Sequence, residues 1–217
     1  MFAVIAPATD LTLLTIAELR AAAVADNSQD ATLLPLGRYV TSAITKACRV
    51  ATDGATPPTL RLETVSDTFR SHSHGLGRHS YPARHRGHKL ELSRKPIVEM
   101  ISVVENGITL DPATDYSINK SAGLLTRLRD DRESWWCDGT IVVTDRAGYA
   151  TAPDDLKYAV IKFVQAITQQ AGRDPLLRFK RIEGLSEYRY DPTEDSIIPA
   201  EVMDLLEQGG FVNTWIG

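Results

Sequence analysis

The segment Ile97-Val-Glu-Met-Ile-Ser-Val-Val-Glu-Asn-Gly107 gives the clearest indication of the fold. Its first eight residues are rich in β-branched side chains and predict a strand. Because apolar residues fall on both faces of this strand, we expect it to be buried on both sides or to lie in an interface between subunits. Asn106-Gly107 follows directly, and both residues tolerate the positive φ of a type I′ turn, which predicts a tight hairpin.

Strand patterns continue on both sides of this hairpin. Alternating apolar and polar residues predict a β-region from about residue 60 to residue 146, with a further turn at Gly123 and a β-branched strand at 141–144. Residues 70–89 interrupt the pattern with Ser, Gly, His and Arg and have almost no apolar periodicity. We interpret them as an exposed loop between two strands.

Three helices are predicted outside the β-region. Thr15-Ile-Ala-Glu18 has the form of a capping box and predicts a helix over about 15–25. Apolar residues spaced by three or four predict a longer helix over about 30–51. Pro153-Asp154-Asp155 opens the third, over about 154–171. We therefore predict an α+β fold: an α-helical bundle of two N-terminal helices plus a later long helix, with an inserted antiparallel β-hairpin region and an extended C-terminal tail.

Length and composition favour one domain with an appendage. The chain has 217 residues, 43% of them hydrophobic, and we predict one domain over 1–190 followed by an acidic C-terminal extension over 191–217 that contains a short helix. The sequence lacks an apolar run of about 18 residues and a basic secretory signal, so we expect a soluble, unexported protein without membrane contact. Two cysteines are too few for a disulfide framework or a thiolate zinc site.

Charge is distributed unevenly along the chain. The formal net charge is −4, yet residues 70–89 contain no acid, five cations and all five histidines. This basic loop can bind the phosphates of DNA or an acidic protein surface, and the sequence leaves both interpretations open. The residues that we predict to face nucleic acid or a channel are Arg70, Arg78, Arg84, Arg86 and Lys89.

The C-terminal extension has the opposite character. Residues 191–217 carry six acids and no Lys or Arg, and they end in apolar and aromatic side chains that so short a tail cannot bury by itself. We predict that a partner surface buries them, because clustered aromatic and aliphatic side chains are typical anchors of protein interfaces. The predicted partner-binding residues are Leu205, Leu206, Phe211, Val212, Trp215 and Ile216.

No motif in the sequence predicts catalysis. Gly-x-Ser-x-Gly, the phosphate-binding glycine-rich loop and His-Glu-x-x-His are all absent. The histidines of the basic loop are candidate zinc ligands, but they lie among Gly and Ser beside five cations, whereas metal ligands need a rigid second shell. We therefore predict a protein that is not an enzyme and that binds no metal and no cofactor.

The order of several short motifs resembles a known family. The motifs are Leu90-Glu-Leu-Ser-Arg-Lys-Pro-Ile-Val-Glu-Met-Ile-Ser-Val103, Asp115-Tyr-Ser-Ile-Asn119, Gly123-Leu-Leu-Thr-Arg127, Gly139-Thr-Ile-Val-Val-Thr144, Ala147-Gly-Tyr149 and Pro153-Asp-Asp-Leu-Lys157. With the helical segment before them, they are similar to the head–tail connector proteins, also called adaptor or head-completion proteins, of long-tailed bacteriophages and related gene transfer particles. The resemblance covers most of residues 10–190.

This resemblance implies a structural role in a virion. Family members form a homo-oligomeric ring, commonly of twelve subunits, beneath the portal protein of the DNA-filled head, and a tail or stopper protein attaches below. The resemblance thus implies a place at the head–tail junction, assembly in the cytoplasm of a bacterial host, and non-specific contact with packaged DNA. The basic loop and the C-terminal extension depart from a minimal member. The alternative is a small DNA-associated protein that uses the His/Arg-rich loop 70–89.

Overall fold

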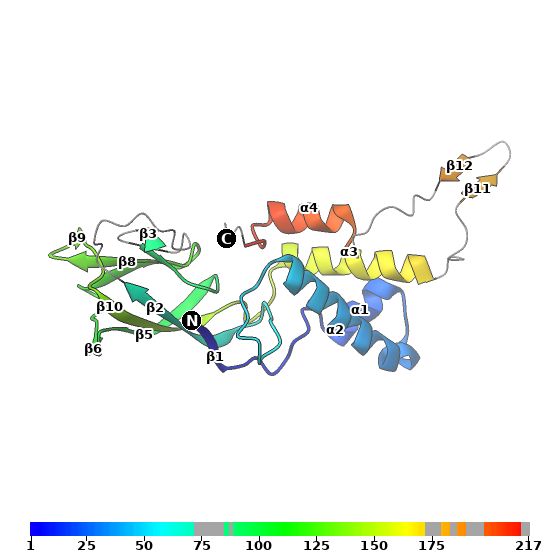
Figure 1. Cartoon of the computed structure of the whole chain (residues 1–217). Helices are drawn as coiled ribbons and strands as arrows, with labels where there is room; N and C mark the ends of the chain where they lie inside the picture. Colours follow the sequence, from blue (N-terminus) through cyan, green and yellow to red (C-terminus); the bar gives the residue numbers. More distant parts are fainter. Residues whose placement is uncertain (72–84, 87–88, 172–178, 183–185, 190–197, 214–217) are drawn as a thin grey trace. The chain divides into compact units, whose positions relative to one another are not determined.

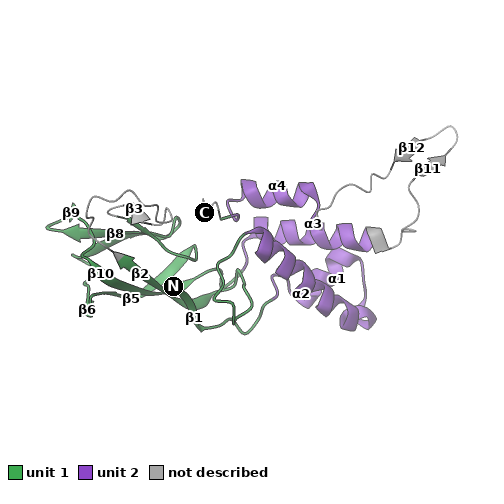
Figure 2. Ribbon diagram, in the orientation of Figure 1, with its two compact units in different colours: residues 1–11, 49–151, 213–217 green, residues 12–48, 152–212 purple. Residues whose placement is uncertain are grey.

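The chain forms two compact units that are each discontinuous in sequence. The computed structural model describes residues 1–71, 85–86, 89–171, 179–182, 186–189 and 198–213. Unit 1 comprises residues 1–11, 49–151 and 213–217, and unit 2 comprises residues 12–48 and 152–212 (Figure 2). Unit 1 contains the long central β-segment, and unit 2 combines helices from before and after it. The predicted boundary between residues 190 and 191 falls outside the described residues, so that division of the chain stays a prediction.

Unit 1 is built from two antiparallel sheets (Figure 1). The first has the order β1-β2-β10-β5-β6, with β1 at Phe2–Ala6, β2 at Glu63–Ser71, β10 at Gly139–Ala147, β5 at Ile97–Glu105 and β6 at Ile108–Thr109. The second has the order β3-β4-β8-β7, with β3 at His85–Arg86, β4 at Lys89–Glu91, β8 at Leu124–Arg129 and β7 at Tyr116–Asn119, and β9 at Arg132–Glu133 pairs with β8. A separate two-stranded pair joins β11 at Phe179–Ile182 to β12 at Ser186–Arg189.

The hairpin predicted from Asn106-Gly107 is confirmed. Both residues have positive φ, 51° and 83°, and they connect β5 to β6 with Glu105 paired to Ile108. Asn106 is fixed further by its side chain, which donates to the carbonyl oxygen of Asp138 at 2.7 Å and accepts from the amide of Thr140 at 2.8 Å. The turn therefore anchors the start of β10 next to β5.

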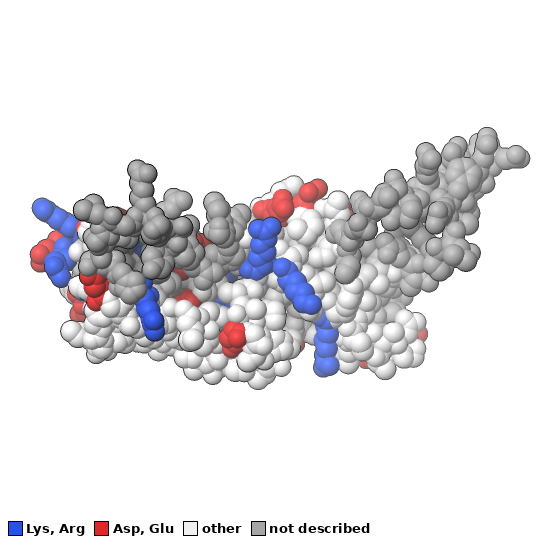
Figure 3. Space-filling model, in the orientation of Figure 1, with Lys and Arg blue, Asp and Glu red and all other residues white. Residues whose placement is uncertain are grey.

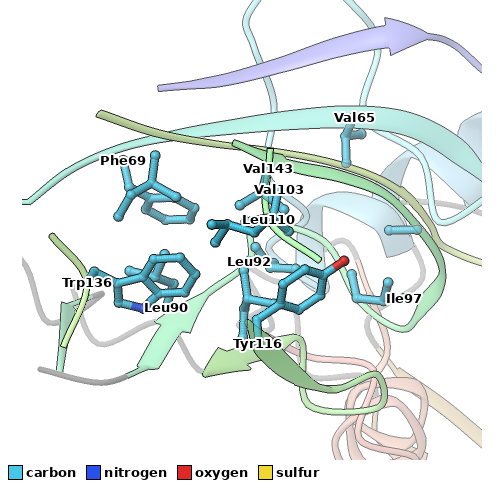
Figure 4. Packing of buried hydrophobic residues seen from close by; sticks show 13 residues of the cluster. Val65, Phe69, Leu90, Leu92, Ile97, Val103, Leu110, Tyr116, Trp136 and Val143 are labelled. Carbon is cyan, nitrogen blue, oxygen red and sulfur yellow. The ribbon is translucent and has the colours of Figure 1, made fainter. Parts of the chain in front are cut away.

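The apolar core of unit 1 contains side chains from both sheets (Figure 4). β2, β5 and β10 contribute alternate residues, as the two-residue period of a strand requires, and the second sheet contributes residues of β4, β7 and β8. The core residues are Val65, Phe69, Leu90, Leu92, Ile97, Val103, Leu110, Tyr116, Leu125, Trp136, Ile141, Val143 and Ala147. Each fully buried aliphatic or aromatic side chain contributes about 1.5–3 kcal/mol relative to an exposed one. This core requires no helix, so unit 1 has a hydrophobic core of its own.

Unit 2 contains the helices, and the residues of the β11–β12 pair belong to it as well. The helices are α1 at Ile16–Ala23, the 3₁₀-helix η1 at Asn27–Gln29, α2 at Asp30–Ala47, α3 at Asp154–Ala171 and α4 at Ala200–Gln208. The predicted capping box is confirmed: Thr15 and Glu18 each bind the backbone amide of the other. Glu18 also accepts from Lys157 at 2.7 Å, which ties α1 to α3. None of the helices in the described part of the chain is long and apolar enough to cross a membrane.

The predicted architecture, a helical bundle with an inserted hairpin region, is wrong. The structure has two antiparallel sheets that pack on each other in unit 1, and the helices lie in the other unit. The error has a physical cause, because amphipathic helices give a strong periodic signal and the strands of a two-layer β-fold look like isolated hairpins until their long-range pairing is known. β1 shows this most clearly, since its partner β2 pairs Phe2 with Asp67 across 65 residues of sequence.

Candidate functional site

The two ends of the basic loop lie in different sheets. Arg70 is exposed near the end of β2 in the first sheet, where it pairs with Thr140. Arg86 and Lys89 are paired in the second sheet through β3 and β4, and the Lys89 ammonium lies 3.3 Å from Glu133. Arg78 and Arg84 fall outside the described residues. The loop therefore links the two sheets, and its contact with nucleic acid or with a channel stays a prediction.

The predicted partner-binding residues at the C-terminal end differ in exposure. Leu206 is fully buried and Phe211 is buried as well, whereas Leu205 and Val212 are only partly covered. Trp215 and Ile216 fall outside the described residues. Asn213 is the last described residue, and its side-chain amide donates to the carbonyl oxygen of Arg49 at 3.2 Å. A role in partner binding stays a prediction for these residues, and Leu206 and Phe211 already pack within the chain.

Large apolar side chains are exposed on the first sheet, and two of them belong to the strand that the sequence predicts to be buried on both sides or to lie in a subunit interface. Ile5, Val98, Ile101 and Ile108 are each about half exposed or more. Ile5, Val98 and Ile101 lie where the pairing register shifts, so each is the extra residue of a β-bulge in β1 or β5. A bulge redirects its side chain and breaks the two-residue alternation, so the alternating pattern does not show on which face these side chains lie. Because β5 is not buried on both sides, the expectation that remains for it is a subunit interface.

A buried ion pair connects β2 to the segment before β5. The guanidinium of Arg94 lies 3.1 Å from Glu63, and the two side chains are 5% and 0% exposed. Arg94 also donates to the carbonyl oxygens of Thr59 and Ala51 and lies over the ring of Phe2, 5.4 Å from its centroid. Burial lowers the pKa of Arg94, and Glu63 opposes that effect. These contacts join β1, β2 and the segment before β5, so the pair is part of the scaffold.

A second buried carboxyl, Asp145 in β10, has no hydrogen-bond partner. Its side chain is 0% exposed, and neither carboxylate oxygen accepts a hydrogen bond in the described chain. Burial raises its pKa to about 7, and the negative charge of Asp67 adds to the effect. Asp67 differs because it accepts from the amide of Ser93 at 2.7 Å and from the Ser93 hydroxyl. A side chain without exposed surface cannot touch a substrate, so Asp145 is not a candidate catalytic group.

The described side chains offer no constellation for metal chemistry. Among them, no group of three or more His, Cys, Asp and Glu side chains is placed to hold a metal ion. The five histidine side chains of the basic loop are not among those described. Both cysteines are free thiols; Cys137 is exposed, and burial raises the pKa of Cys48 to about 12.

Comparison with known proteins shows which fold this is. No protein-family model matches the sequence, and no curated protein matches it. The chain is similar to a chain in the neck of an empty gene transfer agent particle computed with C6 symmetry, with 18% identity and a TM-score of 0.53 over 100% of this chain and 98% of the other. It is also similar to a chain in the virion of a native gene transfer agent particle, with 19% identity and a TM-score of 0.51 over 96% and 94% of the two chains.

At these identities the similarity establishes a shared fold. The fold is that of a chain in a gene transfer agent neck, and it extends over both units because the match covers almost the whole of each chain. The resemblance to gene transfer particles that the ordered motifs predict is thereby confirmed for the fold.

Proposed function

We propose that this protein is a structural subunit of a particle neck, where copies of it form a ring that links the DNA-filled head to the tail. The observation that supports this most strongly is the fold shared with a neck chain over the full length of both chains. A partial match would be compatible with one common module inside unrelated proteins. A match across both units implies the same combination of modules, and the common role is inferred from this shared fold by analogy.

The surface of the first sheet supports assembly. Four large apolar side chains, Ile5, Val98, Ile101 and Ile108, are exposed on β1, β5 and β6. Single exposed apolar residues are normal in a monomer, but several on one sheet are typical of a surface that another protein covers. In a ring, neighbouring copies or the adjoining ring would cover them.

The ring has two further partners in this proposal. A portal protein lies above it, and a tail or stopper protein attaches below. Sixfold symmetry in the similar neck means that its symmetric chains are present in multiples of six, and a ring of twelve copies agrees with that number. The role is structural and not enzymatic, and the protein acts in the virion at the head–tail junction.

The test is assembly in vitro. The purified chain is viewed by negative-stain electron microscopy alone and after mixing with portal rings from the same particle. We expect closed rings in at least one of the two samples. Monomers in the first sample together with undecorated portals in the second would overturn the proposal.

A truncated variant tests the role of the tail in docking. Removing residues 214–217 deletes Trp215 and Ile216 but leaves the buried Phe211 and Asn213 in place. We expect weaker binding to the portal, because aromatic anchors dominate interface affinity. Trp135→Ala is the control, since this tryptophan is 66% exposed and lies outside the predicted tail. Equal portal binding by the truncated and full-length chains would exclude the tail as a docking element.

A further inference from the structure

One face of α2 combines cations with apolar side chains. Leu34 and Tyr39 are 42% and 49% exposed, and Arg38 and Lys46 are exposed on the same side of the helix, two turns apart. After Asp30 the helix contains no acid. Neither Arg38 nor Lys46 forms an ion pair in the described part of the chain. We call the exposed residues Leu34, Pro35, Arg38, Tyr39, Ser42 and Lys46 the basic face.

The exposed face of α4 has the opposite charge. α4 contains Glu201, Asp204 and Glu207, all exposed, and no Lys or Arg. Glu201 lies 3.3 Å from Lys162, whereas no ion pair to Asp204 or Glu207 occurs among the described residues. Glu207 lies in the last turn, where the helix dipole disfavours a negative charge, so helix stability does not explain its presence. We call Glu201, Asp204 and Glu207, with the partly exposed Met203 and Leu205 beside them, the acidic face.

These two faces belong to the same unit but do not face each other. α3 packs against α2 and also against α4, and it lies between them in Figure 1. Figure 3 shows basic side chains in the region of α2 and acidic side chains in the region of α4. One copy of the chain therefore cannot neutralise its own basic face with its own acidic face, but a second copy can.

We propose that the basic face of one copy docks onto the acidic face of the next copy, head to tail around the ring. This inference rests on the proposed function and specifies the contact that builds the ring. Two different faces joined in this way form a heterologous interface, which generates a closed ring when the rotation between copies divides a full turn. The charges match in number, since two cations meet two acids and none of the four forms an ion pair among the described residues.

The charged side chains are spaced more widely on α2 than on α4. Arg38 and Lys46 are eight residues apart, about 12 Å along the helix, whereas the acids of α4 extend over about 9 Å from Glu201 to Glu207, with Asp204 and Glu207 about 4.5 Å apart. The long side chains of Arg38 and Lys46 therefore have to reach inward to meet the acids. Apolar side chains lie beside the charges on both faces, Leu34 and Tyr39 on α2 and Met203 and Leu205 on α4. They add apolar surface that the contact can bury. Exposed ion pairs by themselves contribute little, so this apolar burial provides affinity and the charges set the register.

A symmetric pairing of like faces fits the charges less well. Two basic faces or two acidic faces brought together would place like charges next to each other, which costs several kcal/mol in an interface. DNA would complement the basic face alone and would leave the acidic face without a role. A second copy of this chain satisfies both faces at once.

The test is a charge swap in the full-length chain. Arg38→Glu/Lys46→Glu reverses the basic face, and Asp204→Lys/Glu207→Lys reverses the acidic face. We expect each double variant to weaken association between subunits by about tenfold or more. The quadruple variant carries both reversals, and its neighbouring copies are complementary again with the signs exchanged. We expect it to recover most of the lost association. Circular dichroism confirms folding, and sedimentation velocity or native mass spectrometry counts the subunits, on portal rings if assembly requires them.

A control pair separates this contact from a general effect of net charge. Arg129→Glu/Arg132→Glu makes the same change in charge at exposed positions of unit 1 and should leave association unchanged. If wild-type rings form and the two double variants assemble as well as wild type, or the quadruple variant fails to recover, the head-to-tail contact is refuted while the proposed function stands. If wild type never assembles, alone or with portal rings, the proposed function itself has failed.

Discussion

Asp145→Asn should change how the stability of unit 1 depends on pH. The carboxyl of Asp145 is fully buried in β10 without a hydrogen-bond partner, and burial raises its pKa from 3.8 to about 7. A raised pKa means that the folded protein binds this proton more tightly than the unfolded chain does. The free energy of unfolding of the wild type should therefore fall as the pH rises from about 4 to about 7 and should level off above that.

The size of the effect follows from the two pKa values. They differ by about three pH units, and each unit corresponds to about 1.4 kcal/mol, so the loss reaches at most about 4 kcal/mol. Asparagine has nearly the same shape and does not titrate, so the variant should lack this slope. Relative to wild type, Asp145→Asn should become more stable as the pH rises through that window.

Urea unfolding followed by tryptophan fluorescence measures this difference, because Trp135 and Trp136 lie in the same unit as Asp145. Titrations at pH 4.5, 5.5, 6.5 and 7.5 give the free energy of unfolding of both proteins. Asp130→Asn removes one negative charge from an exposed turn and reports the effect of net charge alone. A stability difference between Asp145→Asn and wild type that stays constant with pH, or that moves in favour of wild type, would refute the reasoning.

Further substitutions test other parts of unit 1. Arg94→Met leaves Glu63 buried without its counter-charge and should lower the free energy of unfolding by about 3–5 kcal/mol. A double variant that removes both charges should lose less stability. A larger loss in the double variant than in Arg94→Met would contradict this prediction. Gly148→Ala places a Cβ 2.4 Å from a backbone oxygen at a φ of +101°, and it should lower the free energy of unfolding by at least about 3 kcal/mol. Gly107→Ala has a positive φ but no clash, and it should lower the free energy of unfolding by about 1–2 kcal/mol. Hydrogen bonds from backbone amides lower the pKa of Asp53 to about 2. The stability that the ionised carboxylate adds is therefore present above about pH 4 and is lost as the pH falls toward 2. Asp53→Asn should be as stable as wild type only at the acidic end of a series of denaturation experiments at different pH values.

Local signals in the sequence predicted local structure well. The capping box of α1 depends on Thr15 and Glu18, and the hairpin depends on two adjacent residues, Asn106 and Gly107. In each case the residues that determine the conformation lie within one turn of chain. Their side chains and allowed backbone angles are then sufficient to predict it.

Features that depend on long-range pairing could not be predicted in this way. β1 is five residues long and becomes a strand through its pairing with β2. Glu63 and Asp145 are charged residues at inward positions of their strands, where an alternating pattern assigns a polar residue to the outer face. The basic face of α2 was also missed, because helix periodicity identifies the buried side and says nothing about which exposed charges remain unpaired.

The central proposal is that this chain forms a ring at the neck of a particle. Electron cryomicroscopy of particles produced by cells that carry the gene measures this directly, with the chain traced into the neck density. We predict one ring of copies between head and tail, in a multiple of six, with the basic face of each copy against the acidic face of its neighbour. A neck whose density contains no ring with this fold, in particles that have both head and tail, would contradict the account.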